Sequence, residues 1–403
     1  MADLLTDLPL FPFHSPEHDP FTPITPADRR HLDGPVTRVR LPTGGWTWLV
    51  TRHADVKVML RSDAFSADMT RPGFPRLREL PPQMPRANRG GFIRMDGKEH
   101  LRLRRMLTTE FMFKHIRRIE PQIADAVDTA LDATEDAGPP ADLITTFALP
   151  VPSLMICHLL GVPYADHALF QQHSARLLDG EDNPQRIRAL AGYLRTLIDT
   201  KRAADDPGDD LLGRLVHERL RTGELELPEL IGMVTLVLIA GYETSANMIG
   251  MSVLLLQQYP SVWQQLREGD DATAEGIVDE LLRYLTVVRA GLPRQALRDV
   301  EIGGQLIRAG EPATALLSMS NRDPDVFADP ETFDPYRQAH QHLAFGFGVH
   351  QCIGQPLARA ELRIALTRLA RRFPGLKVTA AAEDLPKRDD SIVYGLAALP
   401  VTW

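Results

Sequence analysis

Cys352 is the residue whose surroundings point most directly to chemistry. It lies among glycines in the run Phe345-Gly346-Phe347-Gly348-Val349-His350-Gln351-Cys352-Ile353-Gly354. Glycines let a backbone approach a flat ligand closely and point its amide groups at a sulfur atom. A helical pattern begins at Cys352, and the N-terminus of a helix stabilises a thiolate. The pattern therefore indicates a thiolate that binds a metal or reacts.

Three interpretations of Cys352 are open on these features alone. The thiolate is a haem ligand, or a nucleophile with His350 as its base, or a buried cysteine at a helix cap. The second cysteine, Cys157, lies in the apolar helical run Leu154-Met155-Ile156-Cys157-His158-Leu159-Leu160. We expect Cys157 to be an ordinary core residue, because a free cysteine packs as a small hydrophobic side chain.

An acid beside an alcohol forms a second group with chemical potential. Glu243 and Thr244 lie within Ala240-Gly241-Tyr242-Glu243-Thr244-Ser245. The surrounding apolar pattern predicts one central helix over 229–258, roughly 45 Å long at the usual rise per residue. An acid buried midway along such a helix costs stability unless it is solvated, paired or used. The pair indicates either a proton relay or a polar kink.

Charged residues at helical spacing form two further groups. Glu280 and Arg283 lie on one helix face, as an exposed ion pair would. His100 and Arg104 lie one helical turn apart, on a basic helix predicted over 99–111. Arg294 opens a short strand. None of these groups identifies a function by itself.

Together these motifs resemble the cytochrome P450 family, in its soluble actinobacterial class, over nearly the whole chain. The family's haem-binding signature, Phe-x-x-Gly-x-x-x-Cys-x-Gly, is matched by Phe345, Gly348, Cys352 and Gly354. The acid–alcohol pair resembles the family's oxygen-binding motif, although many bacterial relatives have His where Tyr242 stands. Glu280 and Arg283 match its Glu-x-x-Arg motif. The resemblance implies haem b as the cofactor and Cys352 as the iron ligand.

The resemblance also implies a role for each matching residue. Thr244 and Glu243 would deliver protons during O₂ activation, while Glu280, Arg283 and Arg337 would brace the loop that carries Cys352. The expected haem contacts are His100, Arg104, Ala240, Gly241, Arg294, Phe345, Gly346, His350, Cys352 and Gly354. The small residues among them would leave room for O₂. An apolar wall for the substrate would come from Val288, Leu292 and Ile392.

Two groups of basic residues have alternative interpretations. Arg289 either pairs with an acidic group on the substrate or points to solvent. A basic cluster on and after the His100 helix either receives an acidic ferredoxin or is a solvated helix face; its members are Lys98, Arg102, Arg105, Lys114, Arg117 and Arg118. Arg102 and Arg105 are expected to face solvent. Ferredoxin and ferredoxin reductase are the partners that the resemblance implies.

The elements that must position these residues are mostly helices. Short strands are predicted at 46–51, 293–302, 305–308, 313–317 and within 376–403, while 1–45 reads as irregular. Many helices followed by small sheets disfavour a doubly wound sheet or a TIM barrel. We therefore predict a mainly α protein with small β-sheets, as one domain over 1–403. The resemblance implies the P450 fold, a triangular domain with haem between the central helix and the Cys-loop helix. Further helices are predicted at 54–61, 121–137, 144–161, 165–178, 184–203, 209–221, 260–268, 271–285 and 352–373.

Composition and charge exclude some classes of protein. The 403 residues include 45 Lys and Arg against 53 Asp and Glu, a net charge of −8, which gives no general attraction to nucleic acid. Acids at the N-terminus argue against a signal peptide, and polar residues interrupt the longest apolar run, so we expect a cytoplasmic protein without a membrane span.

The predicted activity is a haem-thiolate monooxygenase. It would hydroxylate or epoxidise a medium-sized organic substrate, a natural product or a xenobiotic, with O₂ and electrons from ferredoxin. A haem sensor, a peroxygenase and a cysteine-nucleophile transferase are the rivals. The Glu243–Thr244 pair argues against the first two. The third leaves Glu280, Arg283, Arg294 and His100 unexplained.

Overall fold

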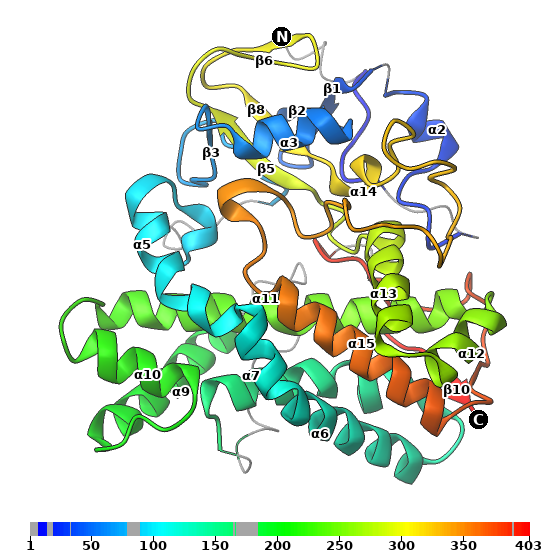
Figure 1. The fold of residues 1–403 in the computed structure, drawn as a ribbon. Coiled ribbons are helices and arrows are strands. Elements are labelled where there is room, and N and C mark those ends of the chain that lie inside the picture. Colours follow the sequence, from blue (N-terminus) through cyan, green and yellow to red (C-terminus); the bar gives the residue numbers. More distant parts are fainter. Residues whose placement is uncertain are drawn as a thin grey trace.

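A computed structural model of the chain describes residues 7–13, 19–32, 34–78, 89–163, 166, 184–388 and 391–403. Figure 1 shows a smaller β-rich part above a larger helical part, with one long helix crossing the molecule between them. The predicted class, mainly α with small sheets, is confirmed. The predicted helix at 165–178, apart from Asp166, lies outside the described residues.

The β-rich part is built on a five-stranded sheet in the order β1-β2-β8-β5-β3. Strand β8 runs parallel to β2, and the other neighbours are antiparallel. Strands β4, β10 and β9 form a second sheet, and β6 pairs with β7 in a hairpin. The strands are β1 (Val36–Arg40), β2 (Trp46–Val50), β3 (Phe65–Ser66), β4 (Ala141–Asp142), β5 (Leu292–Ala296), β6 (Val300–Ile302), β7 (Gln305–Ile307), β8 (Pro312–Ala315), β9 (Lys377–Val378) and β10 (Pro400–Thr402).

Strand β1 corrects the expectation that 1–45 is irregular. Val36 pairs with Val50 at one end and Arg40 with Trp46 at the other. The strand was hard to predict because its arginines obscure the apolar alternation. The guanidinium of Arg38 covers the rings of Trp46 and Trp48 at 4.6 and 4.5 Å, so a charged residue serves here as a packing surface.

The helical part surrounds α11, with α6 packed against α15 and α7 against α11. The prediction of a helix from Pro121 was short, because α6 begins at Phe113. Buried Ile116 and Ile119 extend the apolar stripe of Ile123 backwards past the proline. The helices are α2 (Pro26–Arg29), α3 (His53–Arg61), η1 (Phe92–Arg94), α5 (Gly97–Thr108), η2 (Thr109–Phe111), α6 (Phe113–Ala137), η3 (Ile144–Ala148), α7 (Pro150–Leu160), α9 (Pro184–Ala203), α10 (Leu211–Leu215), η5 (Val216–Leu220), α11 (Leu227–Leu256), α12 (Pro260–Glu268), α13 (Asp271–Leu285), α14 (Leu317–Ser320), η6 (Gly348–His350) and α15 (Gln355–Arg372).

Helix α11 is the central element. A capping box of Glu226 and Glu229 satisfies its first backbone amides, and Pro228 lies in the first turn, where its missing N–H costs nothing. By length and composition this helix is the one in the described chain that could cross a membrane. Every residue from Ser245 to Leu256 is nevertheless buried, which is what the core helix of a globular protein requires.

The segment that carries Cys352 precedes α15 rather than opening it. Helix α15 begins at Gln355, three residues later than predicted, with Pro356 in its first turn. The backbone N–H of Cys352 donates to the carbonyl of Phe345 over 2.8 Å and closes a loop. The thiol therefore belongs to a loop held between the β-rich part and the helical part.

Candidate active site

The Cys352 side chain is exposed by surface area, yet it lies deep among protein groups. Burial raises the pKa of its thiol, and the backbone N–H groups of Gly354 and Gln355 and the guanidinium groups of Arg104 and Arg359 oppose this effect. Amide groups directed at a sulfur stabilise the thiolate that a metal requires. The surroundings therefore suit a metal-bound thiolate whose negative charge is stabilised by backbone N–H groups of its own loop.

Two glycines of the Cys352 loop are required by its shape. Gly346 and Gly348 have φ of 69° and 75°, in the region that side-chain-bearing residues rarely adopt. A Cβ at Gly348 would lie 2.6 Å from the carbonyl oxygen of Leu60. Gly354 differs, because a Cβ there would lie 3.9 Å from Cys352 Sγ, an ordinary contact. The first two glycines fix the loop, whereas Gly354 is not needed for space.

The polar residues among the expected haem contacts, His100, Arg104, Arg294 and His350, lie in one cluster. The His100 and His350 rings stack with centroids 4.1 Å apart, and Arg104 and Arg294 are close enough to lower the pKa of His100. Burial is the first cause of that lowering, and burial also lowers the pKa of Arg294 to about 10. The structure thus brings together residues from α5, β5 and the Cys352 loop that are far apart in sequence.

Arg94 is a fifth member of this cluster that the sequence interpretation missed. Burial lowers its pKa, and Arg94 in turn lowers the pKa of Arg294. The one carboxylate that opposes these effects, Asp96, already accepts hydrogen bonds from the Ser66 hydroxyl and from the Ala67 N–H at 2.9 Å. The sequence feature that could have identified Arg94 is its position as a charged residue between two apolar ones, Ile93 and Met95.

The Glu280–Arg283 pair is completely buried, unlike an ordinary surface pair. Arg283 Nε and Nη2 donate to the two carboxylate oxygens of Glu280 over 2.6 and 2.8 Å. Arg337 Nε adds a third bond to Glu280, over 3.3 Å. The predicted three-residue network is present. Arg283 also donates to the backbone carbonyls of Asn321, Pro330 and Thr332, so it fixes the long loop before Cys352.

Glu243 and Thr244 lie side by side on α11 with different partners. The Thr244 hydroxyl donates to the Ala240 carbonyl over 2.6 Å, inside the helix. The Glu243 carboxylate is buried and accepts from Arg388 over 2.7 Å. Sequence reasoning missed Arg388, which stands 145 positions away. The acid is therefore paired, as its burial requires.

The two small residues before this pair differ in their surroundings. Ala240 is exposed although it lies midway along the central helix. Gly241 faces α7, where a Cβ would lie 2.8 Å from Ile156 Cδ1. The absence of a side chain at position 241 thus has a packing reason, and Ala240 alone faces open space.

A second acid lies near the same part of α11. Ser245 Oγ donates to Glu361 Oε2 of α15 over 2.8 Å, and both residues are buried. Burial raises the pKa of Glu361 to about 7, with the Ser245 hydrogen bond opposing. This pair was not predicted, because Glu361 stands in an ordinary amphipathic pattern.

The predicted substrate residues Val288, Leu292 and Ile392 are all partly exposed, as wall residues should be. Arg289 does not follow either of its two predicted roles. It is buried, donates to the Pro20 carbonyl over 2.6 Å and lies 3.5 Å from the centroid of the Tyr394 ring. Arg289 joins both ends of the chain to the core instead of facing substrate or solvent.

Arg102 and Arg105 behave differently from one another. Arg105 is exposed, as expected. Arg102 is half-buried and forms ion pairs with Glu99 and with Glu229 of α11, so it does not simply face solvent.

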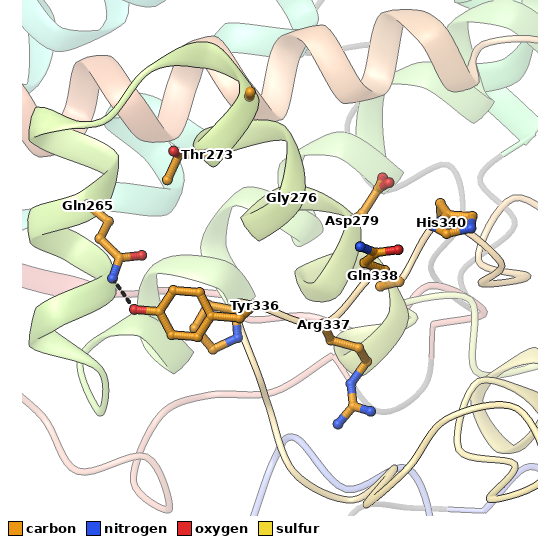
Figure 2. Close-up of a pocket in the computed structure, with 11 residues that line it drawn as sticks. Gln265, Thr273, Gly276, Asp279, Tyr336, Arg337, Gln338 and His340 are labelled. Carbon is orange, nitrogen blue, oxygen red and sulfur yellow. Dashed lines mark hydrogen bonds between the residues drawn. The ribbon is translucent and has the colours of Figure 1, made fainter.

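A surface pocket of about 380 Å³ lies away from Cys352, between α12, α13 and the loop after Phe333. Figure 2 shows Tyr336 and Gln265 at one side, joined by a 2.6 Å hydrogen bond, with Asp279 and His340 at the other. Asp279 accepts from Arg359 over 2.9 Å. The pocket therefore belongs to the structure that braces the Cys352 loop.

Comparisons with known proteins agree with this geometry. The family model described as Cytochrome P450 matches residues 180–393. Cytochrome P450-SU2 of Streptomyces griseolus is 45% identical over 96% of this chain and 94% of its own length. Pentalenic acid synthase of Streptomyces avermitilis is 43% identical over 95% of each chain. The crystal structure of the mycinamicin VIII C21 methyl hydroxylase MycCI from Micromonospora griseorubida, bound to mycinamicin VIII, is similar with a TM-score of 0.89 and 36% identity, over 98% of this chain and all of that one.

The chain belongs to the cytochrome P450 family and is a P450 monooxygenase of the bacterial type. The predicted family and fold are confirmed. The family implies haem, and the residues present fit such a group: His100 Nε2 is buried without a hydrogen-bond partner in the described chain, beside the guanidinium groups of Arg104 and Arg294. Two propionates would satisfy this donor set.

Proposed function

We propose that this protein inserts one atom of O₂ into a medium-sized, largely apolar organic molecule, by hydroxylation or epoxidation, with haem b ligated by Cys352. The cluster of Arg94, Arg104 and Arg294 with His100, beside the Cys352 loop, carries the proposal, because these partly or fully buried guanidinium groups lie near a single opposing carboxylate of the described chain, Asp96, and an anionic ligand would balance their charge. We place the whole reaction in one domain, 1–403, of a cytoplasmic protein.

The cofactor would supply oxygen activation, and its thiolate ligand would favour O–O cleavage. Cys352 would hold the iron. Phe345 and Gly346 lie at the start of the same loop and Gly354 at its end, where they would flank the porphyrin. His100, Arg104, Arg294 and His350 would bind its propionates. Ala240 is exposed on α11, and its small side chain would leave room for O₂.

Thr244 and Glu243 supply protons in this proposal. The Thr244 hydroxyl already donates to the Ala240 carbonyl, which leaves its oxygen free to accept a hydrogen bond from a water molecule. Glu243 is the adjacent acid, and positioned acids contribute about 10²–10⁴-fold to proton-transfer steps. The two residues would move protons inward while the packed core around α11 excludes bulk water.

The class of substrate is supported by the relatives. One is named for the synthesis of pentalenic acid and another hydroxylates a methyl group of mycinamicin VIII. Natural products of similar size suit the apolar wall of Val288, Leu292 and Ile392. Because Arg289 is engaged with Pro20 and Tyr394, an acidic group on the substrate gains nothing from it. A neutral or weakly polar natural product or xenobiotic fits best.

A ferredoxin with its reductase would supply electrons. Beside α5 and the Cys352 loop the surface exposes Met112, Phe113 and Val349. Exposed basic residues of α5 and of the first turns of α6 suit an acidic partner; they are Lys98, Arg105, Lys114, Arg117 and Arg118. Arg102 contributes less than predicted, because Glu99 and Glu229 neutralise it.

The reduced, CO-bound protein is expected to show the red-shifted Soret band of a thiolate-ligated haem. Cys352→His should abolish that band while haem is still bound. Cys157→Ser is the matched control and should leave the band unchanged, because burial raises the pKa of Cys157 to about 12 and keeps it a packed thiol. A wild-type spectrum typical of imidazole-ligated haem would refute the proposal.

Arg94→Gln is expected to accelerate haem loss about tenfold or more, the equivalent of one charge-assisted hydrogen bond. Transfer of haem from the purified holoprotein to excess apomyoglobin, followed by absorbance, measures this rate without any turnover. Arg94→Lys should retain part of the effect. Arg105→Gln removes an exposed arginine nearby and should behave as wild type; equal rates in the Arg94 and Arg105 variants would exclude Arg94 from haem binding.

A further inference from the structure

Arg388 connects the acid of α11 to the turn near the C-terminus. Its Nη2 atom donates to Glu243 Oε2 over 2.7 Å, and the two side chains are 14% and 2% exposed. Its backbone N–H donates to the Gly395 carbonyl over 2.9 Å. Arg388 is therefore attached to residues 391–396, here called the C-terminal turn, by its backbone and to α11 by its side chain.

The C-terminal turn has a second contact with α11, one helical turn further along. A Cβ on Gly395 would lie 2.0 Å from Asn247 Oδ1, so the backbone of the turn lies directly against that side chain. Glu243 and Asn247 are four residues apart and share one face of the helix. The same face of α11 thus holds the C-terminal turn at both residues.

A third contact attaches this turn to the predicted substrate wall. The Tyr394 N–H donates to the Val287 carbonyl over 2.8 Å, next to Val288. Ile392, the wall residue of the turn, lies two positions before Tyr394 and four after Arg388. A displacement of Ile392 by a bound molecule would therefore act on a turn that also contacts Asn247 of α11 and Arg388, the partner of Glu243.

We propose that Arg388 is a positioning residue that holds the Glu243 carboxylate for proton delivery and couples it to the C-terminal turn that contacts substrate. The inference rests on the proposed relay of Glu243 and Thr244. A planar guanidinium that donates to a carboxylate oxygen, as Arg388 does, fixes the carboxylate in direction as well as in charge, whereas a lysine fixes mainly the charge. Without Arg388 the buried carboxylate loses a partner and its single orientation.

The test uses the holoenzyme with a [2Fe–2S] ferredoxin, its NADPH-dependent reductase, NADPH and O₂, without an organic substrate. Two outcomes compete for the electrons. One NADPH, one H⁺ and one O₂ give one H₂O₂ and NADP⁺; two NADPH, two H⁺ and one O₂ give two H₂O and two NADP⁺. The second outcome requires further protons at the oxygen, so the share of peroxide per O₂ consumed reports proton delivery.

Arg388→Met is expected to slow proton delivery about tenfold and to raise the peroxide share to the level of Glu243→Gln. Arg388→Lys should recover only part of the wild-type partition, because it restores the charge but not the direction of the bond to Glu243. The double variant Glu243→Gln/Arg388→Met should match Glu243→Gln alone, because Arg388 acts through that acid. Arg371→Met, an exposed arginine of α15, is the control.

The two proposals fail in different ways. If Glu243→Gln and Thr244→Ala raise the peroxide share while Arg388→Met does not, the relay stands and the role of Arg388 is refuted. If Glu243→Gln and Thr244→Ala leave the partition unchanged, the relay itself is wrong, and the inference about Arg388 falls with it. An effect of Arg388→Met that persists in full on the Glu243→Gln background would also overturn it.

Discussion

Replacing Arg283 with methionine is expected to lower the free energy of unfolding by about 3–5 kcal/mol, because it leaves the completely buried Glu280 carboxylate without its fork. The same change removes the donors to the Asn321, Pro330 and Thr332 carbonyls, which fix the loop before Cys352. Urea unfolding of the holoprotein, followed by circular dichroism and by haem absorbance, measures the loss. The haem signal should disappear at a lower urea concentration than in wild type.

Two further variants make this expectation sharp. Arg283→Lys keeps the charge but not the fork, so its stability should fall between wild type and Arg283→Met, and it remains measurable if the methionine variant does not fold. Arg298→Met breaks an exposed ion pair with Asp63 and should leave the unfolding curve unchanged. A loss below about 1 kcal/mol in Arg283→Met would mean that water reaches the pair and that the network does not brace the loop.

Residues that act through local spacing could be predicted from the sequence. Glu280 and Arg283 lie three positions apart on one helix, and the glycines around Cys352 are adjacent in the chain. Spacing alone indicated an ordinary ion pair and a glycine-rich loop, and the network with Arg337 was expected from the family resemblance. Gly241 proved to have a different role from the expected one. It is small because α7 packs against it, a reason that lies on a helix far away in sequence.

Residues whose partners come from distant elements could not be predicted. Arg388 reaches Glu243 across 145 positions, and Arg289 reaches Pro20 across 269. Arg289 stood in an apolar run, which suggested a pocket or the surface. Instead, the Arg289 guanidinium is buried against the Tyr394 ring and donates to the Pro20 carbonyl. This environment exists only when both ends of the chain pack against Arg289, so it depends on tertiary packing and not on the local sequence.

The start of α15 and strand β1 show the same limit at the level of elements. The helical pattern extends through Cys352, but the loop closed by Cys352 N–H and Phe345 O takes the backbone out of the helix until Gln355. In strand β1, arginines interrupt the alternation of apolar and polar residues by which a strand is recognised. In both cases a specific tertiary contact overrides the local pattern.

Glu361→Gln is expected to change how stability depends on pH. Burial raises the pKa of Glu361 from 4.5 to about 7 in the folded protein. Between these two values the folded state keeps a proton that the unfolded state has lost, so wild-type stability decreases as pH rises through this window. The loss reaches on the order of 3 kcal/mol above pH 7, at about 1.4 kcal/mol per pH unit.

Glutamine removes this loss because it cannot ionise, and its carbonyl can still accept from Ser245 Oγ. The variant and wild type should therefore have similar stability near pH 4.5, and the variant should be the more stable by up to about 3 kcal/mol at pH 8. Urea unfolding at each pH measures the difference, with exposed Glu383→Gln as the control whose curve runs parallel to wild type. Parallel curves for Glu361→Gln as well would show that the carboxyl ionises as easily in the folded protein as in water. Solvent would then reach the contact between α11 and α15 beside Thr244, and the dry core that the proposed proton relay requires would be absent.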